Sequence, residues 1–238
     1  MPLLVWDKGK DKSKSIVNSH GGFRDAKDCL QHIDHFTEWG GHSWAYLTQY
    51  ALSKVETLQN KRVLEIGFRF GKMTSLFALL GAEVTGLETD ASVIPKAQQE
   101  AATWGVSSRV SFFHYDGDLS HCSVLKGKTF DIIFSKSVLV LLCDGLPRYL
   151  HALDELLAVQ GRYIFLENAY GGRIFALIRY IREKELRHPV NREYFTRFHL
   201  RAISDVFGIQ EVKKSYLPPI YLIMGCKKDR LTLQNYDD

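Results

Sequence analysis

The pattern of hydrophobic positions alternates along the chain. Some segments have the periodic spacing of a helix, and others are the short continuous apolar runs of a buried strand. Apolar runs such as "RVLEIG" and "TFDIIFS" alternate with segments such as "KMTSLFALLG" and "LPRYLHALDELLAV", in which apolar residues recur every three or four positions. Alternating strands and helices predict a parallel sheet with right-handed crossovers and helices on both faces. The continuously apolar strand cores fit this prediction, because such strands are buried on both sides.

The pattern defines seven strands and five helices. We predict strands at 62–67, 82–89, 109–116, 129–135, 162–168, 209–217 and 220–228, and helices at 43–54, 72–81, 92–105, 146–159 and 197–208. Ser43 is a candidate N-cap, Pro95 lies near the start of its helix, and Gly81 and Gly105 end theirs. The predicted fold is therefore α/β: a Rossmann-like, seven-stranded, mostly parallel sheet with an antiparallel edge hairpin joined at Pro218-Pro219.

Three further segments flank or interrupt this pattern. Residues 1–58 are predicted to form an N-terminal helical cap segment, 59–228 the main domain, and 229–238 a polar tail. Within the main domain, about 169–196 is rich in arginine and aromatic residues. We interpret it as an inserted cap over a site, with a helix from about Arg173 to Leu186.

Composition limits the classes of partner. The net charge of +4 suits anionic ligands, but it is too small to indicate nucleic acid. The four cysteines are far apart and lack zinc spacing, which predicts free thiols in a reducing, cytoplasmic compartment. The N-terminus lacks the apolar core of a signal peptide, and the run 138–142 is much shorter than the ~20 residues that span a bilayer, so no membrane span is expected.

The first strand runs into a glycine turn, "EIGFRFGKMT", which is where α/β sheets bind nucleotides. A P-loop needs four residues between its glycines and a hydroxyl after the lysine, but three residues separate Gly67 from Gly71, and Met73 follows the lysine. A dinucleotide fingerprint needs glycine at the positions of Arg69 and Lys72. Both patterns therefore fail here.

A third pattern matches better: an acid, one residue, then glycines at alternate positions. Glu65, Gly67 and Gly71 fit it, and Arg69 alone departs from it. In this motif the sequence resembles the class I S-adenosylmethionine-dependent methyltransferases, over about residues 61–228. Their cofactor carries no phosphate, so a turn that admits close backbone approach is sufficient. We expect the side chain of Arg69 to point outward.

The resemblance makes 59–228 the methyltransferase catalytic domain, with S-adenosyl-L-methionine as cofactor. It implies that Glu88, 21 residues after Gly67, accepts hydrogen bonds from the ribose hydroxyls, and that Asp116 contacts the adenine amino group, with Asp118 as the alternative. The full cofactor-binding set is Glu65, Gly67, Phe68, Gly71, Glu88, Thr89, Asp116, Gly117 and Ser135. Asp90 is interpreted as a helix cap instead.

Methyl transfer to a hydroxyl needs a base, whereas an amine needs only to be neutral. The candidate catalytic residues are His42, His199 and Lys136, and the candidate substrate-binding residues are Asn168, Tyr170 and Arg173. Histidine suits proton abstraction near neutral pH. No carboxylate cluster indicates a metal, and none is expected.

The predicted function is S-adenosylmethionine-dependent methylation of a small molecule or a sugar intermediate, anionic if the arginine-rich cap contacts it, most simply at oxygen. The alternatives are an N-methyltransferase of RNA or protein, or a non-catalytic scaffold with the same fold. The N-P-P-[YF] tetrapeptide of amino-directed nucleic-acid methyltransferases is absent, since the fourth strand is followed by Ser135-Lys136-Ser137-Val138. Nucleic acid is therefore not the expected partner, and the protein is expected to be a monomer or homodimer.

Overall fold

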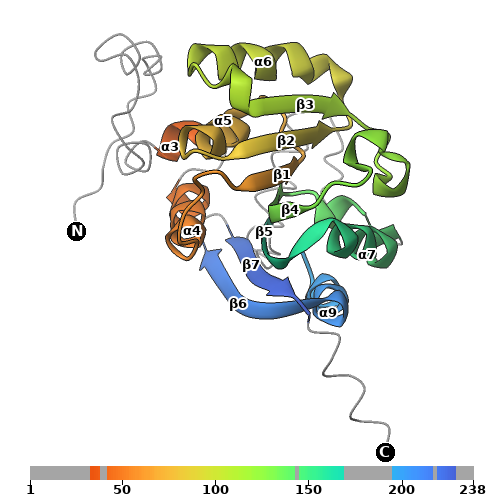
Figure 1. Ribbon diagram of the computed structural model, residues 1–238. Helices are drawn as coiled ribbons and strands as arrows, with labels where there is room; N and C mark the ends of the chain where they lie inside the picture. Colours follow the sequence, from red (N-terminus) through yellow and green to blue (C-terminus); the bar gives the residue numbers. More distant parts are fainter. Residues whose placement is uncertain (1–32, 38–41, 143–144, 169–194, 217–218, 229–238) are drawn as a thin grey trace, which may run out of the picture.

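The computed structural model describes residues 33–37, 42–142, 145–168, 195–216 and 219–228. Its centre is one seven-stranded sheet in the order β3-β2-β1-β4-β5-β7-β6 (Figure 1). The strands are β1 (Arg62–Ile66), β2 (Glu83–Glu88), β3 (Val110–His114), β4 (Phe130–Lys136), β5 (Leu157–Asn168), β6 (Phe207–Tyr216) and β7 (Pro219–Lys227). All run parallel except β7, which is antiparallel to both β5 and β6. The predicted fold class is confirmed.

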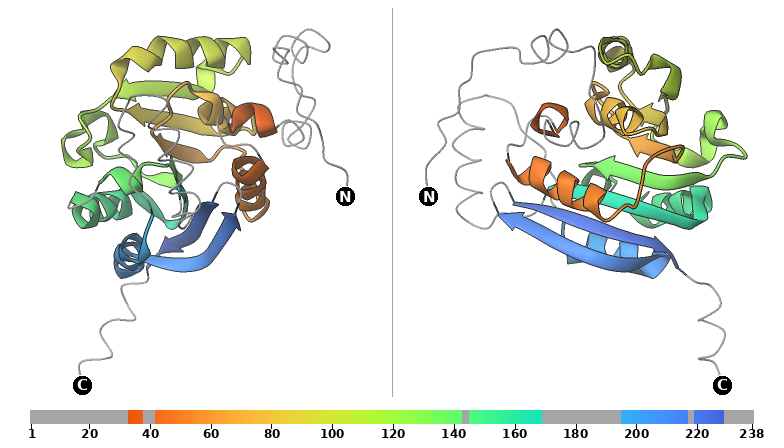
Figure 2. Two further views of the ribbon diagram at one scale, coloured as in Figure 1. Left: turned by 180° about the vertical axis from the view of Figure 1, so that it is seen from behind. Right: turned by 60° about the vertical axis from the view of Figure 1, so that its left-hand side comes forward.

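Helices cover both faces of the sheet (Figures 1 and 2). One face carries α3 (Ile33–Phe36), α4 (His42–Ser53), α5 (Lys72–Leu79) and α6 (Ile94–Thr103), and the other carries α7 (Leu146–Leu156) and α9 (Arg197–Val206). Short 3₁₀ helices η1 (Ala91–Val93), η2 (Ser107–Arg109), η3 (Leu119–His121), η4 (Ser123–Leu125) and η5 (Leu139–Leu141) lie in the connections. The inserted cap and its helix fall outside the described residues.

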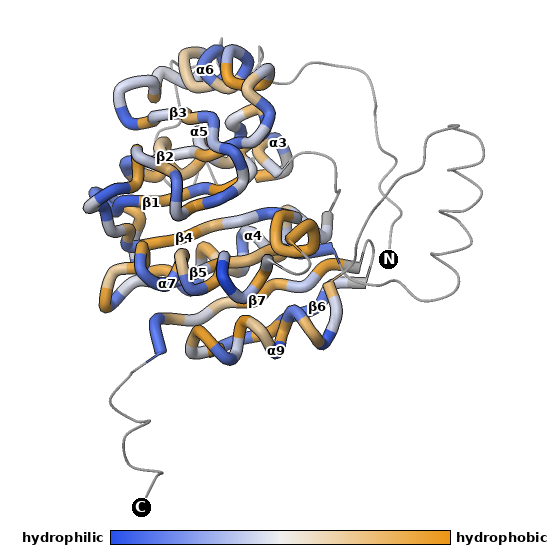
Figure 3. Tube along the Cα trace, turned by 90° about the vertical axis from the view of Figure 1, so that its right-hand side faces the viewer, coloured by the Kyte–Doolittle hydropathy of each residue, from blue (hydrophilic) through white to orange (hydrophobic). Residues whose placement is uncertain are grey.

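Alternate residues of the central strands face two separate hydrophobic cores. In β4, Ile132 and Phe134 pack under α4 and α5, whereas Ile133 packs under α7. All three are at most 2% exposed, as expected for a strand buried on both sides. Hydrophobic residues accordingly dominate β4 in Figure 3, while hydrophobic and hydrophilic residues alternate along α9, which has an exposed face.

The predicted ends of α5 and α6 are confirmed. Gly81 and Gly105 follow α5 and α6 with φ of +95° and +69°, which glycine adopts most readily. In each case the glycine N–H and the next N–H bond back to the carbonyls of the last turn, at 2.9–3.1 Å, in a Schellman motif. Pro95 lies in the first turn of α6, and Asp90 caps η1 by accepting a hydrogen bond from the Ser92 N–H at 2.9 Å.

Some boundaries differ from the prediction. Helix α7 ends at Leu156, not at 159, because β5 begins at Leu157 and pairs there with Phe130. Ser43 is not the residue before α4: the helix begins at His42, and the Ser43 hydroxyl contacts that of Ser215 at 2.6 Å. The hairpin is present, but β7 lies between β5 and β6, so of the two strands only β6 lies at an edge.

The topology determines where a ligand fits. Strand β1 lies between β2 and β4, so chain order reverses at β1 and the carboxyl ends of β1, β2 and β4 are adjacent. Ligands in open α/β sheets bind in the crevice outside such a switch point. In the described part of the chain, no helix combines the length and apolar character needed to cross a membrane.

Candidate active site

The turn between β1 and α5 is compact because three of its residues have left-handed backbone. Gly67, Arg69 and Gly71 have φ of +76°, +50° and +74°. The Gly67 N–H donates to the Leu87 carbonyl of β2 at 2.8 Å, and the Gly71 N–H donates to the Phe68 carbonyl at 2.9 Å. The turn is therefore held against the end of β2.

Both glycines also allow close packing. A Cβ at Gly71 would lie 2.8 Å from the Cβ of Ala97 in α6, and a Cβ at Gly67 would lie 2.8 Å from Cγ2 of Val138 after β4. Neither distance is compatible with a side chain in the present positions. The two glycines thus let α6 and the segment after β4 close on the turn from different sides.

Arg69, which departs from the glycine pattern, contributes through its backbone. Its N–H donates to Oε2 of Glu88 at 3.0 Å. Its side chain is exposed, with the guanidinium carbon 5.8 Å from the centre of the Phe70 ring. This exposed placement agrees with the expected outward orientation.

The Glu88 carboxylate at the end of β2 is fixed by surrounding donors. Besides the Arg69 N–H on Oε2, its Oε1 accepts from the Thr89 N–H at 2.8 Å, the Thr89 hydroxyl at 3.3 Å and the Asp90 N–H at 3.4 Å. The side chain is half-exposed. A carboxylate offers about four lone-pair positions, so this arrangement leaves acceptor capacity chiefly on Oε2, beside the glycine turn.

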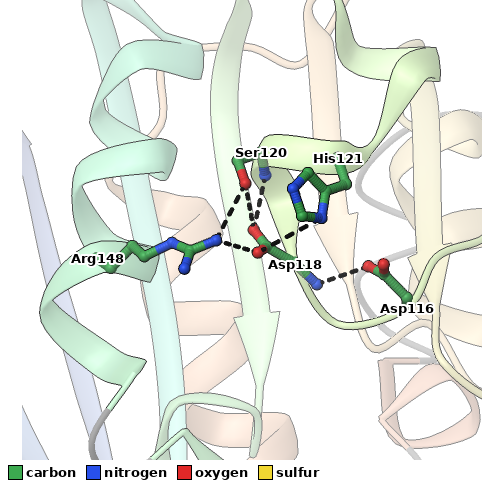
Figure 4. Close-up of polar contacts among 5 residues, drawn as sticks. All are labelled: Asp116, Asp118, Ser120, His121 and Arg148. Atoms are coloured by element: carbon green, nitrogen blue, oxygen red, sulfur yellow. Dashed lines mark hydrogen bonds and ion pairs between the residues drawn. The ribbon is translucent and has the colours of Figure 1, made fainter.

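The two acids after β3 have different surroundings (Figure 4). Asp118 is held by the Ser120 N–H at 3.0 Å and the Ser120 hydroxyl at 2.6 Å, and it pairs with Arg148 and, at 3.7 Å, with His121. The Ser120 hydrogen bonds, helped by Arg148, lower the pKa of Asp118. Asp118 is therefore the N-cap of η3.

Asp116 is exposed, and its Oδ1 accepts the Asp118 N–H at 2.9 Å. The segment lies beside the end of β2, since the Tyr115 N–H donates to the Glu88 carbonyl at 3.0 Å and a Cβ on Gly117 would lie 3.9 Å from Thr89. This geometry favours Asp116 over Asp118 as the acceptor for a ligand that also reaches Glu88.

Three members of the predicted cofactor set are buried and support the site from beneath. Glu65, 3% exposed, accepts the Thr74 hydroxyl at 2.5 Å and so ties β1 to α5. The Phe68 ring, also 3% exposed, lies 4.8 Å from that of Phe112 and over Gly86, so its backbone is what faces the turn. Ser135 is fully buried beside Glu167, where burial raises the pKa of the Glu167 carboxyl and the Ser135 hydroxyl opposes part of that rise.

Two candidate bases have fixed structural partners. The Lys136 ammonium donates to the Thr37 carbonyl and lies 4.9 Å from the centre of the Trp44 ring. These two contacts join the end of β4 to α4 and to the residue after α3. Nδ1 of His199 accepts the Thr196 N–H at 3.1 Å and contacts the Thr196 hydroxyl at 3.0 Å, in a capping box at the start of α9. His199 is 6% exposed.

The third candidate base, His42, is the first residue of α4, but its side chain lies outside what the structure describes. Of the candidate substrate residues, Asn168 ends β5 and donates from Nδ2 to the Ser137 hydroxyl at 2.9 Å. Tyr170 and Arg173 lie outside the described residues. Lys136 and Asn168 thus lie at the ends of β4 and β5, and the His199 ring lies 5.3 Å from that of Phe195, whose N–H donates to the Asn168 carbonyl.

Sequence reasoning missed Glu167 near the end of β5. Its side chain is completely buried and accepts hydrogen bonds from three N–H groups after β4. Burial raises the pKa of its carboxyl from 4.5 to about 8, against the opposing effect of those N–H groups. The sequence feature that could have revealed Glu167 is its place directly after the apolar run "YIFL" in "RYIFLEN", since the topology places this strand inside the molecule.

The edge described here fits a neutral nucleoside. Carboxylates at the ends of β2 and β3 are acceptors for hydroxyl and amino groups, and the turn between β1 and α5 presents backbone instead of a cationic phosphate cradle. No group of three or more histidine, cysteine, aspartate or glutamate side chains that could hold a metal ion occurs within the described ranges.

Comparisons with known proteins agree with this geometry. Residues 63–161 match the sequence model of a family described as a methyltransferase domain. No curated protein matches the chain. The match spans β1 to the first residues of β5 and includes the glycine turn, Glu88 and Asp116.

Solved structures share the fold at low sequence identity. The N-methyltransferase NodS from Bradyrhizobium japonicum WM9, in complex with S-adenosyl-L-homocysteine, superposes with a TM-score of 0.61 at 16% identity, over 84% of this chain and 99% of that one. Magnesium protoporphyrin IX methyltransferase from Synechocystis PCC 6803, with the same bound compound, gives 0.59 at 16% identity, over 92% and 94%. YcgJ from Bacillus subtilis gives 0.59 at 15% identity, over 77% and 99%.

Proposed function

Since residues 63–161 match a methyltransferase-domain family, we propose that the chain is a class I S-adenosylmethionine-dependent methyltransferase that transfers the methyl group to a small molecule or a sugar intermediate, at an oxygen atom. Binding of the cofactor is inferred chiefly from the Glu88 carboxylate, which four donors fix beside the glycine turn. Oε2 accepts the ribose hydroxyls, and Asp116 accepts the adenine amino group.

The chain's own residues bind and orient the reactants. The backbone of Gly67 and Arg69 forms the floor of the nucleoside site, and Glu65 and Ser135 hold the two flanking strand ends from beneath. When bound, S-adenosylmethionine supplies an electrophilic methyl group on a sulfonium. The protein has to hold the acceptor in line with that methyl and exclude water.

The choice of acceptor rests on the end of β4. The N-P-P-[YF] tetrapeptide is absent, and Ser137, which stands near that place, is hydrogen-bonded to Asn168. This argues against a flipped nucleobase as substrate. A neighbour in fold is named for a small-molecule substrate, magnesium protoporphyrin IX.

A hydroxyl acceptor needs a base, and we assign that role to His42. Helix α4 begins with this residue, and the next two positions lie at the carboxyl edge of the sheet: Ser43 contacts Ser215, and Trp44 lies over the Lys136 ammonium. Lys136 and His199 already have partners in the N-terminal segment and in the α9 cap. They therefore serve as anchors in this proposal.

The function is tested with S-adenosylmethionine labelled at its methyl group, incubated with the protein and with separate small-molecule, protein and RNA fractions. Label in the small-molecule fraction, in an alkali-stable ether or a labile ester, supports the proposal. Label confined to RNA or protein contradicts it and favours the N-methyltransferase alternative. No transfer, together with no binding of the cofactor, favours a scaffold.

The base is tested by comparing His42→Ala with His151→Ala, which changes an exposed histidine on α7. Loss of a general base lowers the rate by about 10²- to 10⁴-fold, so His42→Ala should lose turnover and keep its affinity for S-adenosylhomocysteine. His151→Ala should match the wild type in both. Unchanged turnover in His42→Ala would remove this residue from the mechanism.

A further inference from the structure

The last three residues of β5 hold the segment that follows β4. The Ser137 N–H donates to the Leu166 carbonyl at 2.8 Å, and Asn168 donates to the Ser137 hydroxyl at 2.9 Å. Between them, Oε1 of Glu167 accepts the N–H groups of Val138 at 3.3 Å and Leu139 at 3.1 Å. Oε2 of Glu167 accepts the next N–H, that of Val140, at 3.4 Å.

This segment has a strained entry. Ser137 has φ of +57°, an uncommon conformation for a residue with a side chain. Such conformations persist where the surroundings determine them, and they gather at functional sites. Among the described residues, Ser137 is held here by Leu166 and Asn168 of β5.

The segment in turn forms one wall of the glycine turn. Val138 packs directly on Gly67, because a Cβ there would lie 2.8 Å from Cγ2 of Val138. Leu139 and Val140 are buried in the core beneath α7, so the segment is anchored on one side and touches the turn on the other. A displacement of Val138 would therefore reshape the turn at Gly67.

Burial of the Glu167 carboxyl costs free energy, which its hydrogen bonds to the segment after β4 offset. Its side chain is fully buried, and its neighbours Phe165 and Leu166 are fully buried and apolar. Burying a carboxyl without partners costs free energy, and leaving these three N–H groups, of which those of Leu139 and Val140 are buried, without an acceptor does so as well. An apolar residue at this position would remove the acceptor for all three N–H groups at once.

We propose that Glu167 is a positioning residue for the cofactor: its carboxyl fixes Val138 to Val140, so that Val138 sets the shape of the turn at Gly67. The assignment rests on the proposed function, because the turn is taken as the cofactor site. Glu167 does not touch the ligand. It acts through the segment after β4.

The test compares two substitutions that differ in acceptor capacity. Glu167→Gln keeps an oxygen in reach of Val138 and Leu139, and it resembles the protonated acid that the raised pKa makes the main form at neutral pH. Glu167→Met keeps a similar length but offers no oxygen acceptor. By calorimetry, Glu167→Gln should bind S-adenosylhomocysteine within about threefold of the wild type, and Glu167→Met at least about tenfold more weakly.

Coupling to Val138 separates positioning from general destabilisation. Val138→Ala should also weaken binding, and in the double variant with Glu167→Met the two losses should not add, because both act through one segment. Ile203→Ala, at a fully buried position of α9 beside the edge strand β6, is the control for stability. It should lower the melting temperature and leave affinity within about twofold, since three strands separate β6 from β1 in the sheet.

The outcomes are distinct. A wild-type protein that does not bind S-adenosylhomocysteine contradicts the proposed function itself. If the wild type binds, three results would each overturn the role of Glu167 and leave the proposed function intact. The first is a folded Glu167→Met with unchanged affinity, and the second is an equal loss of affinity in Glu167→Met and Glu167→Gln. The third is a loss of affinity in Glu167→Met that adds to the loss in Val138→Ala.

Discussion

At the scale of single residues, two glutamates near the carboxyl edge have opposite surroundings. Glu88 is half-exposed and keeps its carboxylate beside the turn, with backbone N–H groups as partners. Glu167 is fully buried and faces backbone N–H groups and Ser135. Exposure suits the first to a ligand, and burial suits the second to support.

The burial of Glu167 predicts a pH dependence of stability. The pKa of this carboxyl rises from its ordinary value of 4.5 to about 8 in the folded protein, so between these values the folded state binds more protons than the unfolded state. The contribution of Glu167 to the free energy of unfolding is therefore complete below pH 4.5 and falls as pH rises to about 8. At about 1.4 kcal/mol for each pH unit, the loss is about 3–5 kcal/mol.

Urea unfolding of the wild type and Glu167→Gln at about pH 5, 6, 7 and 8 measures this directly. As pH rises, the free energy of unfolding of the wild type should fall relative to that of Glu167→Gln, because glutamine does not titrate. A difference that stays constant over this range would show that the carboxyl does not titrate there.

At the scale of elements, the start of α9 explains a candidate base. His199 occupies the third helical position of a capping box with Thr196, where glutamate or glutamine is the usual residue. His199→Gln should therefore keep both the stability and the methyl transfer of the wild type, whereas His199→Ala should lose about 1 kcal/mol of stability. Thermal unfolding and label transfer measure the two quantities, and loss of transfer in a stable His199→Gln would restore its catalytic role.

The glycine turn predicts a contrast between two alanine substitutions. Gly71 and Gly105 share a left-handed backbone, with φ of +74° and +69°, but a Cβ would clash with Ala97 at Gly71 and meet nothing within 4 Å at Gly105. Gly105→Ala should cost about 1–2 kcal/mol from backbone strain alone. Gly71→Ala should cost about 1–3 kcal/mol more because it overpacks the contact with α6.

Denaturant unfolding of the two variants gives the comparison, with Gly105→Ala as the control for backbone strain. Equal losses would mean that α6 adjusts without cost and that its close approach to the turn is not maintained by Gly71.

The sequence was informative about elements wherever local chemistry decides them. Gly81, Gly105 and Asp90 marked element ends correctly, because a left-handed glycine or a side-chain cap acts within a few residues. The end of α7 was misplaced, since the pairing of Leu157 with Phe130 comes from a distant strand. The hydrogen bonds of Glu167 to the segment after β4 were invisible for the same reason.

At the scale of the whole molecule, the alternation of strands and helices was sufficient to predict the sheet. It also placed Glu88 and Asp116 at one edge, because the carboxyl ends of parallel strands meet there. Burial was harder to predict: Glu65 and Ser135 belong to the motif, yet both lie beneath the site. The order of strands determines which edge binds, and the packing of the layers determines which residues of that edge a ligand reaches.

The central claim is that the ends of β1 and β2 together bind S-adenosylmethionine through Glu88. Calorimetric titration of S-adenosylhomocysteine into the wild type, Glu88→Ala and Glu83→Ala tests it most directly, because Glu83 is an exposed acid at the opposite end of the same strand. The wild type and Glu83→Ala should bind equally. Glu88→Ala should bind at least about tenfold more weakly, since a hydrogen bond to a charged group contributes about 1.5–3 kcal/mol. Absence of binding by the wild type, or equal affinity in Glu88→Ala, would contradict the claim.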